Sequence, residues 1–146
     1  MNKVIICMYG RSNEGKTKTI IKFFELLKKK YNIENLEIKN IDSDIFGSLE
    51  IDNIRIGINS QGDPNSESII NKKTKELAEK SCEIIVCSSR TKGNTVWDID
   101  KVADGFDFHT IWISSYYSPQ LDYEVLNSIA ADSLLQVFDS VLTGKI

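Results

Sequence analysis

The sequence lacks long hydrophobic runs and has no excess of basic residues. Its longest apolar run near the start, Val4 to Tyr9, is shorter than the roughly 7–15 residues of a secretory signal core and far shorter than the roughly 20 that cross a bilayer. We therefore expect no export, no membrane contact and a cytoplasmic location. The 18 Lys and Arg residues against 21 Asp and Glu give a formal net charge of −3, so no electropositive field favours nucleic acid as a partner.

Cysteine and histidine are also scarce. The three cysteines, Cys7, Cys82 and Cys87, lie in or beside apolar stretches and lack the paired spacing and neighbouring histidines of a zinc site. We expect them to be reduced core residues rather than a disulfide framework. The single histidine, His109, opens an apolar run, which favours a strand end over a metal ligand or a catalytic base.

The composition that remains is that of an ordinary globular protein. Hydrophobic residues make up 41% and charged residues 27% of the 146 residues, which is enough for one hydrophobic core and too apolar for a disordered chain. No repeat, linker or low-complexity segment divides the chain. We expect residues 1–146 to form a single domain.

Hydrophobic periodicity predicts that strands and helices alternate. Residues 3–9 are almost continuously apolar, which is typical of a parallel strand buried on both faces. The expected strands are 3–9, 36–41, 82–87 and 110–113, and two further strands, 49–51 and 54–58, are expected to form a hairpin around Asp52-Asn53. The expected helices are 15–31, a second one from Ser66 or Ser68 to about 78–81, and then 96–103 and 123–142. This order predicts an α/β fold built as a three-layer sandwich with right-handed crossovers.

One motif carries chemistry. The segment Gly10-Arg-Ser-Asn-Glu-Gly15-Lys16-Thr17 satisfies the pattern G-x-x-x-x-G-K-[ST], and it follows a buried strand and opens an amphipathic helix, as a phosphate-binding loop must. Its glycines let backbone N–H groups surround an anion at the start of the helix. We expect Lys16 to reach the β- and γ-phosphates of a nucleotide and the Thr17 hydroxyl to bind Mg²⁺.

At these residues the chain resembles the P-loop NTPase superfamily. The resemblance implies a mostly parallel five-stranded sheet that binds ATP or GTP with Mg²⁺ at the carboxyl ends of its strands, often with phosphoryl transfer or hydrolysis. It implies a catalytic role for Lys16 and a metal-binding role for Thr17. The residues that it places around the nucleotide are Gly10, Arg11, Ser12, Asn13, Glu14, Gly15, Lys16, Thr17 and Lys18.

The chain departs from the family pattern in two places. The strands that end at 58–60 and 86–88 carry no aspartate, although such a residue usually holds the magnesium shell. The segment Asn59-Ser60-Gln61-Gly62 looks like the D-x-x-G region of small GTPases with Asn59 in place of the aspartate. No N-K-x-D signature for guanine occurs in 89–94 or 113–117, so ATP is favoured over GTP.

Three aspartates are candidates for the remaining chemistry. Asp63 leaves a strand beside the phosphate loop and is expected to orient a Mg²⁺-bound or attacking water, with a local turn cap as the alternative. Asp42 and Asp44 follow the strand 36–41, like the D-x-D of shikimate-type kinases, although a solvated turn is favoured. If that strand lies at the edge of the sheet, both carboxylates are too far from a γ-phosphate to act on metal-bound water.

The sequence thus predicts Mg²⁺-dependent binding of a nucleoside triphosphate, with weak or partner-dependent NTPase or phosphotransferase activity. Two alternatives stay open: a small-molecule kinase of shikimate-kinase-like layout, and a nucleotide-sensing module that binds without turnover. Besides the nucleotide, the partner that we expect is a small-molecule acceptor or a protein. Arg90 and Lys92, after the strand 82–87, either clamp phosphate or a second substrate or are merely solvated.

Overall fold

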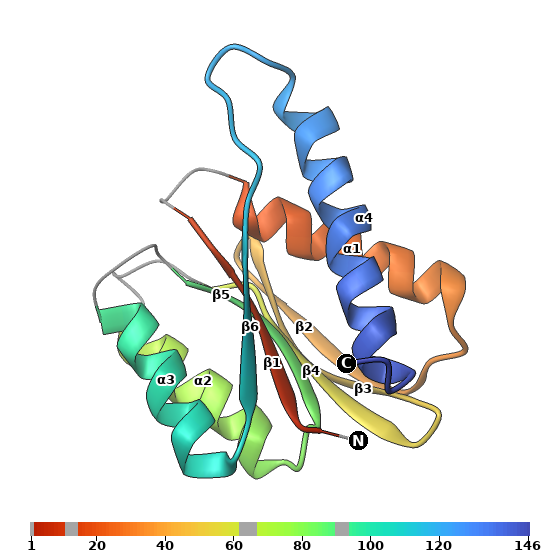
Figure 1. Cartoon of the computed structure of the whole chain (residues 1–146), viewed down its shortest axis with the longest axis vertical. Coiled ribbons are helices and arrows are strands. Elements are labelled where there is room, and N and C mark those ends of the chain that lie inside the picture. Colours follow the sequence, from red (N-terminus) through yellow and green to blue (C-terminus); the bar gives the residue numbers. More distant parts are fainter. Residues whose placement is uncertain (1, 11–14, 62–66, 90–93) are drawn as a thin grey trace.

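The computed structural model describes residues 2–10, 15–61, 67–89 and 94–146. Within these residues the chain forms six strands and four helices (Figure 1). The strands are β1 (Val4–Tyr9), β2 (Glu34–Ile41), β3 (Asp44–Ile51), β4 (Ile54–Asn59), β5 (Ile84–Ser89) and β6 (His109–Ser114), and the helices are α1 (Lys16–Lys30), α2 (Glu67–Glu79), α3 (Asn94–Phe106) and α4 (Tyr123–Leu142).

All six strands join one mixed sheet in the order β2-β3-β4-β5-β1-β6. β4, β5, β1 and β6 pair in parallel, whereas β3 runs antiparallel to both β2 and β4. The sheet has six strands rather than the five that the family resemblance implies, and the residue patterns themselves predicted six strand segments. The predicted first arm of the hairpin, 49–51, is only the end of β3, which is a full strand between β2 and β4.

Helices cover both faces of this sheet (Figure 1): α1 and α4 lie on one face, and α2 and α3 on the other. The central strands are therefore buried on both sides. In β1, Ile6 and Met8 pack with the α1 and α4 face, while Ile5 and Cys7 pack with the α2 and α3 face. The α/β class predicted from the alternation of strands and helices is confirmed.

Tight turns hold the β2-β3-β4 part of the sheet together. Asp52 and Asn53, between β3 and β4, have φ of 53° and 65°, which is the conformation that two-residue hairpin turns require and that Asp and Asn tolerate. The predicted hairpin turn is confirmed. Asp42 begins the turn between β2 and β3 with φ of 55°.

Helix α4 combines an apolar composition with a packed inner face. By length and mean hydropathy, 1.2 over its most apolar window, α4 is long and apolar enough to span a membrane, the one such helix in the described part of the chain. Its buried residues include Ala130, Leu134, Phe138 and Val141, and the Phe138 ring meets Phe23 of α1 edge-on at 5.5 Å between centroids. Packing of this stripe against α1 and the sheet accounts for the apolar composition on one side of the helix.

All three cysteines are free and buried, as predicted. Cys7 and Cys87 are register partners on β1 and β5, and a hydrogen bond between their side chains, together with burial, raises the pKa of the Cys87 thiol well above its ordinary value. Burial raises the pKa of Cys82 to about 11 against the opposing charges of Arg55 and Lys80. Thiols in this state are protonated at neutral pH and serve as apolar packing rather than as nucleophiles.

Candidate functional site

Two adjacent strands in the sheet send their following helices to opposite faces. β1 leads into α1 on one face, and β5 leads to α3 on the other (Figure 1). Such a pair marks a topological switch point, and open α/β sheets bind ligands there, outside the carboxyl ends of the strands. Gly10 lies at this point because it follows β1 and its N–H donates to the carbonyl oxygen of Ser89, at the end of β5, over 3.2 Å.

Gly15 directly precedes α1 and has a backbone conformation that favours glycine. Its φ is +82°, in the left-handed region, and a Cβ added at this position would lie 2.3 Å from Oδ1 of Asn127 in α4. Both the backbone and the neighbour therefore exclude a side chain. Gly15 provides no side-chain cap and the first turn of α1 carries no acidic residue, so no side chain of that turn neutralises the positive end of the helix dipole.

Lys16 is buried at the same place, with 7% of its surface exposed. Its ammonium group donates hydrogen bonds to the carbonyl oxygens of Gly10, at 2.6 Å, and Ser89, at 2.9 Å. These acceptors follow β1 and end β5, so the cation is held across the switch point. A buried ammonium requires such partners because an unpaired charge in the interior is very costly.

Thr17 is linked to a carboxylate from the antiparallel strand. Its hydroxyl Oγ1 lies 3.0 Å from Oδ1 of Asp44, the first residue of β3. The hydroxyl of Ser60, the residue after β4, donates to the same Oδ1 at 2.8 Å. Three polar side chains from α1, β3 and the end of β4 thus meet next to Lys16.

Ser60 also fixes the backbone around this carboxylate. Its Oγ accepts the N–H of Ile45 at 2.9 Å, and its own N–H donates to the Ile45 carbonyl oxygen at 3.0 Å. The Ser60 carbonyl oxygen accepts the hydroxyl of Ser88 in β5 at 2.8 Å. The start of β3, the end of β4 and the end of β5 are therefore joined by one residue.

The amide side chains on either side of Ser60 behave differently. Asn59 is fully buried; its amide nitrogen donates to Oγ1 of Thr74 in α2 at 3.3 Å, and its Oδ1 accepts the Gln61 N–H at 3.2 Å. Asn59 thus has a local structural role. Oε1 of Gln61, in contrast, is buried without a hydrogen-bond partner in the described structure.

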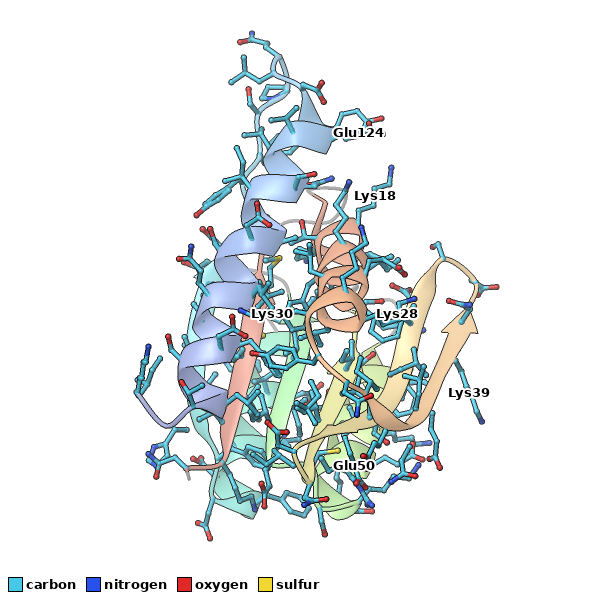
Figure 2. The ribbon with its side chains drawn as sticks, turned by 90° about the vertical axis from the view of Figure 1, so that its right-hand side faces the viewer. Lys18, Lys28, Lys30, Lys39, Glu50 and Glu124 are labelled. Atoms are coloured by element: carbon cyan, nitrogen blue, oxygen red, sulfur yellow. The ribbon has the colours of Figure 1, made fainter. Side chains whose placement is uncertain are left out.

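Several residues predicted from the motif converge in the structure. Gly10, Gly15, Lys16 and Thr17 lie together at the switch point. Lys18 does not join them: it is exposed, its ammonium lies 5.2 Å from the centre of the Tyr123 ring, and it projects beside the start of α4 (Figure 2). The remaining candidates lie outside the described residues: Arg11, Ser12, Asn13, Glu14, Asp63, Arg90 and Lys92.

The expectation for the Asp42–Asp44 pair needs correction. β2 is an edge strand, and Asp42 is exposed in the turn that follows it, as the solvated-turn interpretation predicts. Asp44, however, is the first residue of β3, the next strand inward, and lies at the edge of the sheet where β4 ends, so its carboxylate contacts Thr17 instead of being too distant.

Sequence reasoning also missed the roles of Ser60, Ser88, Gln61 and Asn127. The only signal in the sequence was the run of small polar residues that follows each of the two buried strands β4 and β5. In the residues that the structure describes, no three His, Cys, Asp or Glu side chains gather as a metal-binding group. Magnesium in nucleotide sites is usually bound by one or two protein oxygens, phosphate oxygens and waters, so Thr17 and Asp44 suit that chemistry.

Comparison of the chain with protein-family models, with curated proteins and with solved structures gives no match. Evidence for a function therefore comes from the geometry of the site and from the motif.

Proposed function

We propose that this protein binds a nucleoside triphosphate together with Mg²⁺ at the carboxyl ends of β1 and β5, in the manner of a P-loop protein. The buried ammonium of Lys16 is the observation that carries the proposal. It sits at the N-terminus of α1, within the motif 10–17, and donates hydrogen bonds to the carbonyl oxygens of Gly10 and Ser89. These contacts hold its positive charge at the ends of β1 and β5, where charge-assisted hydrogen bonds would recognise a phosphate group.

The residues divide the work of binding as follows. The backbone at Gly15 and the start of α1 direct N–H groups and the positive helix end toward phosphate. Lys16 exchanges carbonyl acceptors for phosphate oxygens, and the Thr17 hydroxyl binds Mg²⁺, which screens the phosphate charge. ATP is favoured because the chain carries no N-K-x-D segment for guanine.

Turnover, where it occurs, is phosphoryl transfer that is weak or dependent on a partner. The oxygen of water, or of an acceptor hydroxyl, attacks the γ-phosphorus; the bond from that phosphorus to the bridging oxygen breaks, the diphosphate leaves, and the proton of the nucleophile passes to a base. Asp63 is our proposed residue for orienting the attacking water, since it comes soon after β4 in the sequence, in the segment Gln61-Gly62-Asp63.

A small-molecule kinase is the second candidate, and one observation favours it. Asp44 contacts Thr17, as expected of a carboxylate that faces both the metal and an acceptor hydroxyl. A kinase releases little inorganic phosphate without its acceptor, whereas an NTPase releases it with water alone. A nucleotide-sensing module gives a binding signal with neither product.

A thermal-shift panel tests the proposal. Wild-type protein is heated with ATP, GTP, ADP and GDP, each with Mg²⁺ and with EDTA. Because a ligand that binds only the native state stabilises it by mass action, by about 2.7 kcal/mol at a hundred times its Kd, we expect Tm to rise with Mg-ATP. The substitution Lys16→Ala should abolish this rise.

Lys29→Ala is the matched control, because Lys29 is an exposed lysine on the same helix. It should leave the Mg-ATP shift unchanged. The Tm and circular dichroism of both variants without nucleotide show whether they fold. The proposal fails if wild type shifts with no nucleotide, or if folded Lys16→Ala shifts as much as wild type.

A further inference from the structure

A magnesium ion bound at Thr17 needs a carboxylate, and the ends of the parallel strands β4 and β5 do not provide one. Mg²⁺ keeps several waters in nucleotide sites, and a nearby carboxylate commonly orients them. β4 ends at Asn59 and is followed by Ser60, and β5 ends in Ser88 and Ser89. None of these side chains is anionic, so the carboxylate must come from elsewhere in the fold.

The antiparallel strand β3 brings a carboxylate to the edge of the sheet where the parallel strands end. Parallel strands present their carboxyl ends at this edge, but an antiparallel strand presents its first residue there. The register pairs Phe46 of β3 with Asn59 of β4, so the residues that precede Phe46 extend beyond the end of β4. Asp44 is thereby placed beside the first turn of α1, although it is far from Thr17 in sequence.

The contacts of Asp44 engage only one of its two oxygens. Oδ1 lies 3.0 Å from the Thr17 hydroxyl and 2.8 Å from the Ser60 hydroxyl, while Oδ2 makes no hydrogen bond with the residues that the structure describes. The carboxylate is half-buried rather than sealed in the core. Ser60 and Thr17 therefore set its orientation and leave an oxygen for a metal-bound water.

A second observation concerns the residue that follows Ser60. Oε1 of Gln61, which directly follows Ser60, is buried without a partner in the described structure, and Gln61 is only 9% exposed. A buried amide oxygen that lacks a donor is costly. Water molecules held by a metal ion are strong donors and would satisfy it.

We infer that Asp44 and Thr17 form the protein side of a Mg²⁺ site, in which Thr17 binds the ion and Asp44 accepts hydrogen bonds from its waters. Asp44 thus replaces, from an antiparallel strand, the carboxylate that β4 and β5 lack. This inference rests on the proposed binding of a nucleotide, because phosphate oxygens complete the coordination of the ion.

The test separates metal binding from nucleotide binding. The Tm of wild type, Asp44→Asn and Asp42→Asn is measured with ATP in EDTA and then over a series of Mg²⁺ concentrations. We expect Asp44→Asn to keep the shift seen with ATP in EDTA and to need 10–100-fold more Mg²⁺ for half of the further increase, which is the usual effect of losing a residue that orients metal-bound groups.

Asp42→Asn is the control, because Asp42 is an exposed aspartate in the same β2–β3 turn; its Mg²⁺ midpoint should match wild type. Asp44→Ser, which keeps a hydroxyl for Thr17 and Ser60, is a second variant in case the amide disturbs folding, and it should behave like Asp44→Asn.

Each remaining outcome overturns a stated claim. If wild type and Asp44→Asn have midpoints within twofold, Asp44 does not serve the metal, while nucleotide binding stands. The same conclusion follows if Asp42→Asn shifts the midpoint as much as Asp44→Asn, or if Asp44→Asn loses the shift in EDTA. If wild type responds to no nucleotide at all, the proposed function fails and this inference fails with it.

Discussion

Ser60 illustrates how one small residue can hold a site together. Its hydroxyl lies between the Ile45 N–H and the Asp44 carboxylate, and its carbonyl oxygen accepts from Ser88. Removal of the hydroxyl leaves the buried Ile45 N–H without this acceptor and frees the Asp44 carboxylate to turn. A buried donor without a partner costs roughly 1–3 kcal/mol.

We therefore expect Ser60→Ala to lower the free energy of unfolding by about 1–3 kcal/mol, measured by urea denaturation at neutral pH. Ser48→Ala is the control, since Ser48 is a buried serine of β3 with 8% exposure whose hydroxyl makes no hydrogen bond with the residues that the structure describes. It should change stability by no more than about 0.5 kcal/mol. Equal losses in the two variants would show that Ser60 has no special role.

The sequence predicted those site residues whose positions depend on a short, local pattern. Lys16 and Thr17 were predicted to lie close together because their motif is contiguous. Asp44 was assigned to a distant turn because its position depends on the pairing of β3 with β4, and no short segment encodes that register. Asn127 could not be predicted as a neighbour of Gly15, because the contact joins helices more than a hundred residues apart.

At the scale of elements, β3 depends on close approach to β2. Gly47 has φ of +150°, and a Cβ added there would lie 1.9 Å from the backbone carbonyl oxygen of Glu37 in β2. β2 itself is largely exposed (Figure 2 shows Lys39 projecting from it). Few side chains therefore hold the edge strand, and its backbone pairing with β3 carries most of the attachment.

Substitution of Gly47 by Ala should consequently destabilise the fold by at least about 3 kcal/mol, because it adds both backbone strain and a backbone clash. Gly105→Ala is the matched control. Gly105 lies in α3 with nothing within 4 Å of an added Cβ, so alanine should cost nothing and gain up to about 1 kcal/mol from its higher helix propensity. Thermal unfolding of both variants measures the difference, and comparable Tm values would contradict the packing described for Gly47.

The bounds of α1 and α4 were predicted more accurately than those of β2 and β3. α4 has the predicted bounds, and α1 lies within one residue of them at each end, because an amphipathic helix shows a regular apolar period. The first half of β3, residues 44–48, has no such period: four of its five residues are buried in succession. Apolar and polar residues do not alternate in a strand that is covered on both faces, so only the end of β3, at 49–51, was recognised.

The order of strands is a property of the whole molecule, and the sequence did not determine it. β1 and β5 are both continuous apolar runs that suit any central position. Which of them neighbours β4 depends on how the crossovers pack, not on either segment alone. The prediction therefore reached the α/β class, the three layers and the antiparallel hairpin of β3 and β4, but not the pairing of β2 with β3 or the order of the strands.

The stability of the whole fold should fall at alkaline pH. Burial raises the pKa of Cys82 from 9.0 to about 11, and the pKa values of Cys87 and Tyr31 are also raised, the latter by burial and by a hydrogen bond to Asp139. The unfolded chain releases these protons at lower pH than the folded one does. Their contribution is complete below pH 9 and, for Cys82, is lost as the pH rises from 9 through 11.

Urea denaturation of wild type and Cys82→Ala under reducing conditions checks this expectation. Between pH 8 and pH 11, wild type should lose roughly 2–3 kcal/mol more than the variant, which no longer carries the Cys82 thiol. The variant keeps Cys87 and Tyr31, so it should still lose some stability. A difference between the two proteins that does not change with pH would contradict the raised pKa of Cys82.

The two carbonyl contacts of Lys16 have a consequence for recognition. A lysine free in solvent samples many rotamers, and immobilising it costs up to about 2 kcal/mol in conformational entropy. In this protein folding has already ordered the Lys16 side chain, since its ammonium is bound at the ends of β1 and β5. If the protein binds a nucleotide as proposed, the phosphate meets a cation whose rotameric freedom was already given up during folding, so binding does not carry that entropic cost again.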